Sequence, residues 1–376
     1  MQNLTSDYKP INIIQLISNK VWGGGERYAH DLSTRLRHDG FYVHAITRGY
    51  PVVDNRLTDS GIPVSKAPFN GLFDFKTPRV ICDVAMQLPA DIPLIIHAHD
   101  FKNALLAIRA KHHLKKLGRN AWVVVTRHLV KRAKSDLLNR YVYRNIDSLI
   151  FPSKIVRNEF LSSNPAIDSK KLHLVYNSIF RQNNSIIHHN KTKKDLSSPV
   201  VISFLGRFSP EKGIELLFDS LAMIKDLDWR LRMCGTGHPE YEKSLHQHAE
   251  DLGISDRVEW PGFIEDINSV ISSTDIGVMP SICREAFGLT ILEFISAGIP
   301  VVATDRGGQT EILTTGKDSV LSPAEPGEFS LALRKVIEDP ALRARLGAEA
   351  SATARRFDYE TFYKGILESY RQAIAL

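Results

Sequence analysis

Residues 200–217 read VVISFLGRFSPEKGIELL, and their pattern indicates how the second half of the chain folds. Its apolar run, 200–206, is typical of a strand buried in a parallel sheet. A loop with Arg207 and Lys212 follows, and a helical pattern begins after Gly213. Because strand, loop and helix succeed one another directly, the stretch predicts the start of a doubly wound α/β domain.

The same alternation of apolar runs and amphipathic segments extends in both directions. Residues 23–40 open on glycines and predict a helix with apolar positions at Tyr28, Leu32 and Leu36. Further strands are predicted at 11–18, 41–47, 93–99, 121–126, 147–153 and 172–178, and then at 229–235, 257–263, 275–281 and 300–305. The predicted fold class is therefore α/β, with two Rossmann-like doubly wound domains facing a cleft.

The length of 376 residues also favours two domains over one. The polar segment 180–199 interrupts the alternation and is predicted to be the linker. It separates an N-terminal domain, 1–179, from a C-terminal domain, 200–357. The last segment, 358–376, is a helix with an aromatic stripe, and we expect it to pack back on the first domain.

Composition indicates a globular protein of ordinary kind, with 43% apolar and 24% charged residues. No apolar run has the roughly 18 residues of a membrane span, and no secretory signal is evident at the start. The three cysteines are scattered, which favours a reducing cytoplasm.

Charge is distributed unevenly. Residues 1–185 hold 27 Lys/Arg and 14 Asp/Glu, a net of +13, and the remainder holds 48 − 27 = 21 basic and 42 − 14 = 28 acidic residues, a net of −7. The basic half could attract phosphate groups or the inner face of an anionic membrane, or its basic residues could be ordinary solvated helix faces.

Residues 284–293, REAFGLTILE, place two glutamates eight positions apart. The first, Glu285, lies in the loop after a buried strand, and Glu293 lies in the helix that follows. Eight helical residues would span about 12 Å, a length that suits a ribose–diphosphate–sugar unit with its phosphates on the helix N-terminus. Alternatively, Glu293 is an exposed helix residue and Glu285 a partner in a loop salt bridge.

The loop with Arg207 and Lys212 should lie beside this segment, at the same sheet edge. Arg can bind phosphate oxygens in a bidentate manner and Lys adds a point charge, so the pair suits a diphosphate leaving group. Ordinary pairing with Glu211 or Glu215 is the alternative.

Four segments together resemble the family-4 retaining glycosyltransferases of the GT-B architecture. The resemblance extends from about residue 11 to the C-terminal helix. The segments are GGGERYAHDL (23–32), GRFSPEKG (206–213), PGF (261–263) and the block from MPS to GGQTEI (279–312). The resemblance implies a metal-independent enzyme that binds a nucleotide-diphosphate sugar mainly in the second domain and an acceptor mainly in the first, with no further cofactor.

The resemblance also assigns roles to single residues. Arg207 and Lys212 match the diphosphate-binding pair, Glu285 the glutamate near the donor sugar, and Glu293 the one on the ribose. The remaining donor-binding positions are the backbone of Phe287, Gly288 and Leu289, the base-side loop at Gly262 and Phe263, and the phosphate loop at Gly24 and Gly25. The implied catalytic set is Arg207, Lys212, Glu285 and His128.

Histidines mark the acceptor side. In IIHAHD (95–100), His97 and His99 lie two apart on one face of a strand, a spacing that could indicate a metal pair, although no third ligand is evident. The resemblance makes His99 and Asp100 acceptor-binding candidates and His128 a donor-sugar contact, and a structural role remains the alternative for each. Asp226-Leu227-Asp228 formally matches a metal-binding Asp-x-Asp, but its place before a strand favours a surface turn.

The predicted function is therefore transfer of a hexose, from a UDP-sugar by preference, to a saccharide or lipid-linked acceptor in cell-envelope or polysaccharide synthesis. The basic first domain could also contact the membrane surface. Binding of nucleic acid is not expected. Two alternatives are a nucleotide-sugar epimerase of the same architecture and a basic module that binds nucleic acid or membrane through residues 109–144. An epimerase would act without an acceptor.

Overall fold

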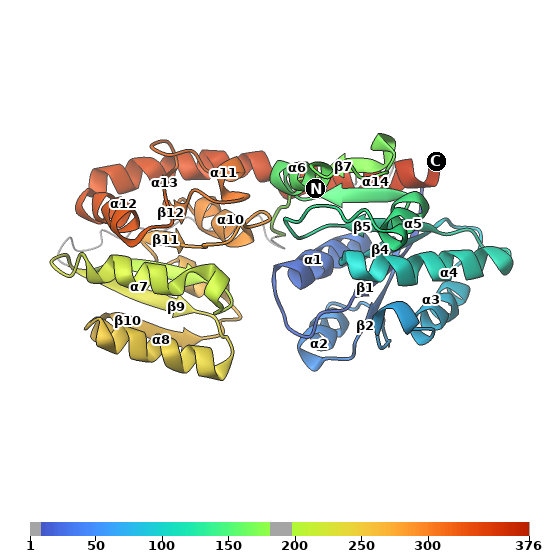
Figure 1. Ribbon diagram of the computed structural model, residues 1–376, viewed down its shortest axis with the longest axis horizontal. Coiled ribbons are helices and arrows are strands. Elements are labelled where there is room, and N and C mark those ends of the chain that lie inside the picture. Colours follow the sequence, from blue (N-terminus) through green and yellow to red (C-terminus); the bar gives the residue numbers. More distant parts are fainter. Residues whose placement is uncertain (1–8, 181–197, 376) are drawn as a thin grey trace. The chain divides into compact units, whose positions relative to one another are not determined.

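The computed structural model describes residues 9–180 and 198–375, and they form two α/β units (Figure 1). Unit 1 comprises residues 1–180 and 359–376, and unit 2 comprises residues 181–358. Most of the expected linker, residues 181–197, lies outside the described part of the chain. The chain thus builds the first unit, then the second, and returns to the first through its last helix.

The sheet of unit 1 has, among the described residues, seven parallel strands in the order β3-β2-β1-β4-β5-β6-β7. Successive strands are added on one side of β1 as far as β3 and then on its other side from β4 onward, so the strand order reverses between β1 and β4. Doubly wound folds bind ligands at this point, at the carboxyl ends of the strands. The strands are β1 (Asn12–Ile17), β2 (Tyr42–Thr47), β3 (Val64–Lys66), β4 (Leu94–Ala98), β5 (Trp122–Thr126), β6 (Ser148–Phe151) and β7 (Leu172–Leu174).

Helices connect these strands and cover the sheet. The first of them buries Tyr28, Leu32 and Leu36, the three positions expected from the sequence. The helices of unit 1 are α1 (Gly24–His38), α2 (Pro51–Asp59), α3 (Lys76–Gln87), α4 (Ala104–Lys116), α5 (Leu137–Asn145), α6 (Lys154–Leu161) and α14 (Tyr359–Ala375).

Helix α14 belongs to unit 1 although it is last in the chain, and Figure 1 shows it in red among the blue and green elements of that unit. Its aromatic stripe faces inward, with Tyr363 and Tyr370 fully buried. Burying each such ring contributes on the order of 2 kcal/mol. The guanidinium of Arg35 in α1 also forms an ion pair with Glu360, with Nη1 2.5 Å from Oε1. The helix is therefore an integral part of the first core.

Unit 2 repeats the plan with six described parallel strands in the order β10-β9-β8-β11-β12-β13. The strands are β8 (Val200–Leu205), β9 (Trp229–Cys234), β10 (Val258–Gly262), β11 (Ile276–Met279), β12 (Val301–Thr304) and β13 (Ser319–Ser322). The helices are α7 (Ile214–Ala222), α8 (Pro239–Asp251), α9 (Ile267–Ile271), α10 (Leu289–Ser296), α11 (Gln309–Ile312), α12 (Pro326–Glu338) and α13 (Pro340–Ala354).

Every strand expected from the sequence is present, with ends that differ by a few residues. The sequence did not predict β3 or β13, which are the outermost strands of their sheets. Strand β3 has only three residues and none is buried, while β13 reads Ser-Val-Leu-Ser. Neither carries an apolar run of the kind by which the sequence identifies the other strands, including the outermost strands β7 and β10.

Candidate functional site

The loop after β8 brings Lys212 to Glu285 in unit 2. A short 3-10 turn over Pro210–Lys212 leads into α7 through Gly213, whose φ is 66°. A Cβ at that position would lie 2.1 Å from the carbonyl oxygen of Pro280, so only glycine fits there. This close approach joins the loops after β8 and β11, and Nζ of Lys212 lies 2.5 Å from Oε1 of Glu285.

Three further contacts position Glu285. The hydroxyl of Ser281 donates to Oε1 at 2.8 Å, and the backbone N–H of Gly308 donates to the carbonyl oxygen of Glu285 at 2.7 Å. Gly307 forms a bridge to Glu285, and a Cβ on Gly307 would lie 2.3 Å from the backbone nitrogen of Glu285. Both side-chain contacts use Oε1, so within the described residues Oε2 remains available to a substrate hydroxyl.

Helix α10 begins next to this carboxylate. Its N-cap is Gly288, with φ = 105°, and no side chain of the described residues caps its first turn. The first amides of a helix carry partial positive charge, so this start can bind a phosphate. The side chain of Phe287 is buried and packs edge-on against Phe357, with ring centroids 5.6 Å apart, which fixes the entry to the helix.

Two sequence interpretations of this segment need correction. Glu285 lies in the loop and Glu293 in the helix, as predicted, but eight helical residues do not separate them, because the helix begins only at Leu289. The alternative that Glu293 is an exposed helix residue is also wrong, since it is 3% exposed. Two carboxylates therefore flank an uncapped helix start, one half-buried in the loop and one buried in the first helical turns.

Arg207 occupies the surface of the same loop. Its guanidinium pairs with Glu211, with Nη2 2.9 Å from Oε1, and its side chain is 59% exposed. The pairing proposed as an alternative thus holds for Arg207, whereas Lys212 pairs with neither Glu211 nor Glu215 in the described structure. An exposed ion pair contributes little stability, so Arg207 can exchange its partner for a phosphate at small cost.

The base-side candidates lie at the end of β10. Gly262 adopts φ = 75°, and its carbonyl oxygen accepts from the N–H of Gly235 at 2.8 Å. The next side chain, Phe263, is 50% exposed. An exposed aromatic ring at the carboxyl edge of a parallel sheet can stack on a planar base.

Unit 1 brings a glycine turn and a histidine together. Gly24 and Gly25 form the first turn of α1, directly after the loop that follows β1. A Cβ on Gly25 would lie 4.0 Å from Cδ2 of His128, which follows β5. The ring of Tyr28, one turn into α1, packs edge-on against His128 with centroids 4.9 Å apart. The glycine turn therefore lies against the imidazole that the sequence singled out.

His99 lies in the same cluster, with its ring stacked on that of His128 at a centroid distance of 6.1 Å. Its Nε2 is 2.7 Å from the side-chain oxygen of Gln15, on β1. Burial lowers the pKa of His128 to about 4, and burial with weaker repulsion from neighbouring imidazoles holds the pKa of His99 well below its usual value. Both rings are therefore neutral at physiological pH.

Nδ1 of His99 and Nε2 of His128 are buried and have no hydrogen-bond partner among the described residues. Both are polar atoms at the carboxyl edge of the sheet, where a substrate hydroxyl could satisfy them. Asp100 has a different local task, because its Oδ1 accepts from the backbone N–H of Lys102 and caps a short 3-10 turn.

His97 has a structural role, because hydrogen bonds to side-chain hydroxyls use both of its ring nitrogens and leave neither for a metal shared with His99. Its Nδ1 is 2.8 Å from the hydroxyl of Tyr370, and its Nε2 is 2.8 Å from the hydroxyl of Thr126. Both ring nitrogens are thus occupied, and the imidazole ties β4 to β5 and α14. The described residues contain no cluster of three or more His, Cys, Asp or Glu suited to a metal ion.

Asp226-Leu227-Asp228 forms the turn before β9, as expected. The carboxylate of Asp226 is bidentate with Arg334, at 2.7 and 2.8 Å. The turn enters β9 at its amino end, whereas the candidate residues gather at the carboxyl ends of the strands.

Sequence reasoning missed several residues that shape these two sites. Ser281 and Gln15 hold Glu285 and His99 in place, and the ring of Tyr28 packs edge-on against both His99 and His128. The helical spacing of Tyr28 predicts only an apolar position on the helix. The signal that could have identified them is their position, because Gln15 interrupts an apolar strand and Ser281 follows one directly.

Two family models match the chain, one in each half. The model described as Glycosyltransferase Family 4 matches residues 22–181, and the model described as Glycosyl transferases group 1 matches residues 185–353. The two matches include every donor-side and acceptor-side candidate named above.

Individual proteins give the same result at lower identity. D-inositol 3-phosphate glycosyltransferase of a Nocardioides species is 26% identical over 94% of this chain and 86% of its own length. The crystal structure of Anabaena Alr3699/HepE in complex with UDP-glucose has a TM-score of 0.80 at 23% identity and covers 96% of this chain and 99% of its own. The apo lipopolysaccharide outer core galactosyltransferase WaaB has a TM-score of 0.69 at 20% identity, over 96% of this chain and 99% of its own. The two-unit fold is thus that of GT-B glycosyltransferases.

Proposed function

This chain belongs to the family-4 glycosyltransferases of the GT-B fold, and from that membership we propose that it transfers a hexose from a nucleotide-diphosphate sugar to an acceptor hydroxyl. UDP is the favoured nucleotide, because a structure of similar fold holds UDP-glucose. The acceptor we propose is a saccharide or a lipid-linked saccharide of a cell-envelope or polysaccharide pathway. The name of WaaB, a protein of similar fold, supports this class of acceptor.

One arrangement carries the proposal. Lys212, its partner Glu285 and the uncapped start of α10 adjoin one another at the carboxyl edge of the second sheet. A diphosphate requires positive charge and N–H donors, and a sugar requires a carboxylate that accepts from its hydroxyls. These requirements match the residues present. In the proposed complex the diphosphate lies between Lys212 and the first amides of α10, with Arg207 turned toward it from Glu211.

The proposed chemistry proceeds with retention and without a metal. The bond between the anomeric carbon and the diphosphate oxygen breaks, and the acceptor oxygen forms its bond from the same face. The acceptor proton passes to the departing phosphate oxygen. Arg207 and Lys212 stabilise the negative charge that develops on the leaving group, and His128 holds the donor sugar as a neutral hydrogen-bonding group. Glu293 would accept from the ribose hydroxyls.

Membrane contact through unit 1 is a second part of the proposal. The described residues contain no helix long and apolar enough to cross a membrane. Leu137, Leu138 and Tyr141 of α5 are nevertheless exposed. The hydroxyl of Tyr141 is 3.2 Å from Nδ1 of His112 on α4. Exposed basic side chains accompany them on these two helices, namely Lys115, Lys116, Arg140 and Arg144. Apolar and basic groups on neighbouring helices suit an anionic bilayer surface.

A donor screen tests the central claim. UDP-, GDP- and ADP-sugars are compared for thermal stabilisation of the full chain, and the stabilising donor is then incubated with candidate acceptors while the product anomer is followed by NMR. We expect a UDP-sugar to stabilise most and the product to keep the anomeric configuration of the donor. Inversion would refute the proposed mechanism, and conversion of the donor without any acceptor would favour the epimerase.

Sedimentation with vesicles tests the membrane contact. Vesicles of phosphatidylcholine and phosphatidylglycerol should retain the chain, and vesicles of phosphatidylcholine alone should not. Leu137→Glu should release it without changing stabilisation by the donor. Equal retention of this variant and the wild type would refute a contact through α5.

A further inference from the structure

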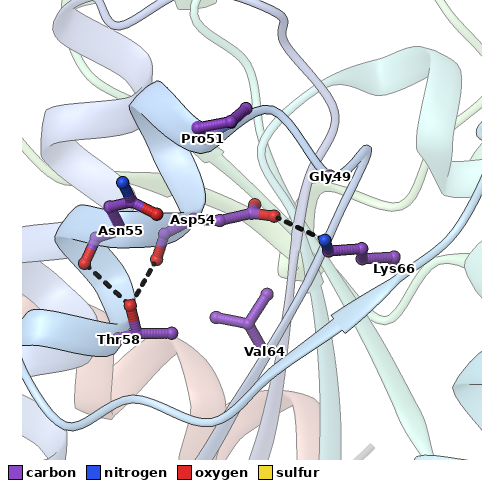
Figure 2. A pocket seen from close by; sticks show the side chains of 7 residues that line it. All are labelled: Gly49, Pro51, Asp54, Asn55, Thr58, Val64 and Lys66. Carbon is purple, nitrogen blue, oxygen red and sulfur yellow. Dashed lines mark hydrogen bonds and ion pairs between the residues drawn. The ribbon is translucent and has the colours of Figure 1, made fainter.

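Unit 1 contains a cavity of about 260 Å³ that none of the roles above uses (Figure 2). It is formed by the turn after β2, the first two turns of α2, and β3. Thr47 and Lys66 are register partners at the ends of β2 and β3, so the cavity lies at the carboxyl edge of the sheet. Its lining residues are Gly49, Pro51, Asp54, Asn55, Thr58, Val64 and Lys66.

Asp54 is a buried carboxylate directed into this cavity, and its residue is 8% exposed. Its Oδ1 accepts from the hydroxyl of Thr47 at 2.6 Å. Its Oδ2 has no hydrogen-bond partner among the described residues and lies 3.9 Å from Nζ of Lys66. That separation allows charge attraction but is too long for a hydrogen bond. A buried carboxylate oxygen that no described residue satisfies can accept a hydrogen bond from a ligand.

The side chain of Lys66 lines the cavity and can change its conformation. Its side chain is 73% exposed, and its stem passes close to Gly49, where a Cβ would lie 3.1 Å from Cδ of Lys66. Gly49 has φ = 86°, a conformation that favours glycine. Figure 2 shows the ammonium of Lys66 directed at Asp54, with Val64 below them. Because an exposed lysine side chain rotates readily, a small movement would uncover Oδ2 of Asp54.

The chemistry of the lining selects the class of ligand. One carboxylate and one ammonium compensate each other, so an anion would meet Asp54 and a cation would meet Lys66. Asn55 and Thr58 add neutral polar groups from α2, and the volume is too small for a drug-sized molecule. A neutral ring with neighbouring hydroxyls suits this wall, because one hydroxyl can donate to Asp54 while another accepts from Lys66.

We propose that this cavity is a subsite for a sugar ring of the acceptor, away from the ring that receives the hexose, and this inference rests on the proposed function. The cavity opens at β2 and β3, while His99 follows β4 and Gly24 follows β1. Strands β2 and β4 flank β1, so their ends are about 10 Å apart at the usual strand spacing. That distance exceeds the width of one sugar ring. The acceptor is accordingly an oligosaccharide, whose further rings extend along the sheet edge toward Asp54.

A glycan array tests the subsite. Synthetic mono- to tetrasaccharides of defined structure are incubated with the labelled full chain and UDP, and retention of the chain by each glycan is measured. Glycans of two or more rings should be retained at least about tenfold better than their single terminal rings. Asp54→Asn should abolish this advantage, because its amide keeps an oxygen for Thr47 but presents N–H groups where the ligand hydroxyl would donate. Asp59→Asn is the matched control, since Asp59 is an exposed carboxylate of α2 outside the cavity.

Asn55→Trp gives a second route that does not depend on the buried carboxylate. Asn55 is exposed and lines the cavity, so a tryptophan should fill the space without disturbing the fold, and it too should remove the advantage of longer glycans. Equal retention of single rings and longer glycans, or unchanged retention by both variants, would overturn the proposal. Stabilisation by UDP-sugar is measured on each variant. A wild type that no nucleotide sugar stabilises would refute the proposed function, whereas unaltered donor binding with unaltered glycan retention would refute the subsite alone.

Discussion

Nζ of Lys212 lies 2.5 Å from Oε1 of Glu285, although 73 positions of sequence separate the two residues. They follow β8 and β11, which are neighbours in the second sheet. The contact places a cation and a carboxylate side by side at the start of an uncapped helix. Without donor, each holds the other in position. With donor, the cation is expected to bind the diphosphate while the carboxylate, still held by Ser281, accepts from the sugar.

Lys212→Ala should lower kcat by about 10²–10³-fold, the loss typical of removing one group that stabilises developing negative charge. The folded state should change little, because Lys212 is a partly exposed residue of a loop. Turnover is measured with saturating donor and acceptor, alongside the melting temperature. Lys243→Ala removes an exposed lysine of α8 and should behave as the wild type. Wild-type kcat in the Lys212 variant would exclude the residue from leaving-group stabilisation.

Gly213→Ala should destabilise unit 2 by clearly more than Gly316→Ala. Both glycines have positive φ, 66° and 79°, so an alanine at either position costs about 1–2 kcal/mol from the backbone. The alanine at 213 would also place its Cβ 2.1 Å from the oxygen of Pro280, whereas nothing lies within 4 Å at 316. Differential scanning calorimetry of both variants measures the difference. If the two melt together, the loops after β8 and β11 do not depend on this close approach.

The central strands and the donor motif could be predicted from sequence because each leaves a local signal. A strand buried on both faces is mostly apolar, as β8 and β11 are, and the loop after it begins at the sheet edge where ligands bind. Arg207, Lys212 and Glu285 therefore appear at strand ends without any knowledge of contacts. The strands β3 and β13 lack this signal, because β3 has only three residues, none of them buried, and β13 has serine at both ends.

Partner choice could not be predicted in the same way. The sequence suggests Glu211 or Glu215 as the partner of Lys212, because both are near it in the chain. The actual partner is Glu285, which the close approach of Gly213 to Pro280 brings within reach. Likewise, His97 and His99 are equivalent by spacing and differ only because Tyr370 and Thr126 occupy both nitrogens of His97. Tyr370 lies 273 positions from His97, a distance in sequence that no local pattern spans.

Glu293→Gln should weaken UDP binding about tenfold, which corresponds to about 1.4 kcal/mol, if its carboxylate accepts from the ribose hydroxyls. A charged acceptor forms stronger hydrogen bonds than a neutral amide does, and Glu293 is buried in α10. Isothermal titration calorimetry with UDP measures the change. Glu349→Gln, an exposed residue of α13, is the control. Identical affinities would remove Glu293 from the nucleotide site.

EDTA should leave glycosyl transfer unchanged. The proposed leaving group is stabilised by Arg207, Lys212 and the start of α10, so positive charge is available from the chain itself. Initial rates are compared with EDTA and with added Mg²⁺ or Mn²⁺. Loss of activity in EDTA that Mn²⁺ restores would contradict this mechanism and direct attention back to carboxylates such as those of Asp226 and Asp228.

The stability of unit 1 should fall as the pH drops from about 6.5 to about 4, partly because of His97. Burial lowers its pKa to about 3, so the folded chain excludes a proton that the unfolded chain binds below its ordinary value of 6.5. Stabilisation is thus fully present above pH 6.5 and is lost as the pH falls toward the folded pKa. Each group of this kind contributes up to about 1.4 kcal/mol per pH unit in that window.

His97→Gln should flatten the profile by about this slope, although it lowers stability at every pH by disturbing the contacts with Tyr370 and Thr126. Urea unfolding at each pH, read by hydrogen exchange of peptides from β4, isolates the response of unit 1. Parallel profiles for wild type and variant would mean that the imidazole of His97 takes up its proton equally well in the folded chain.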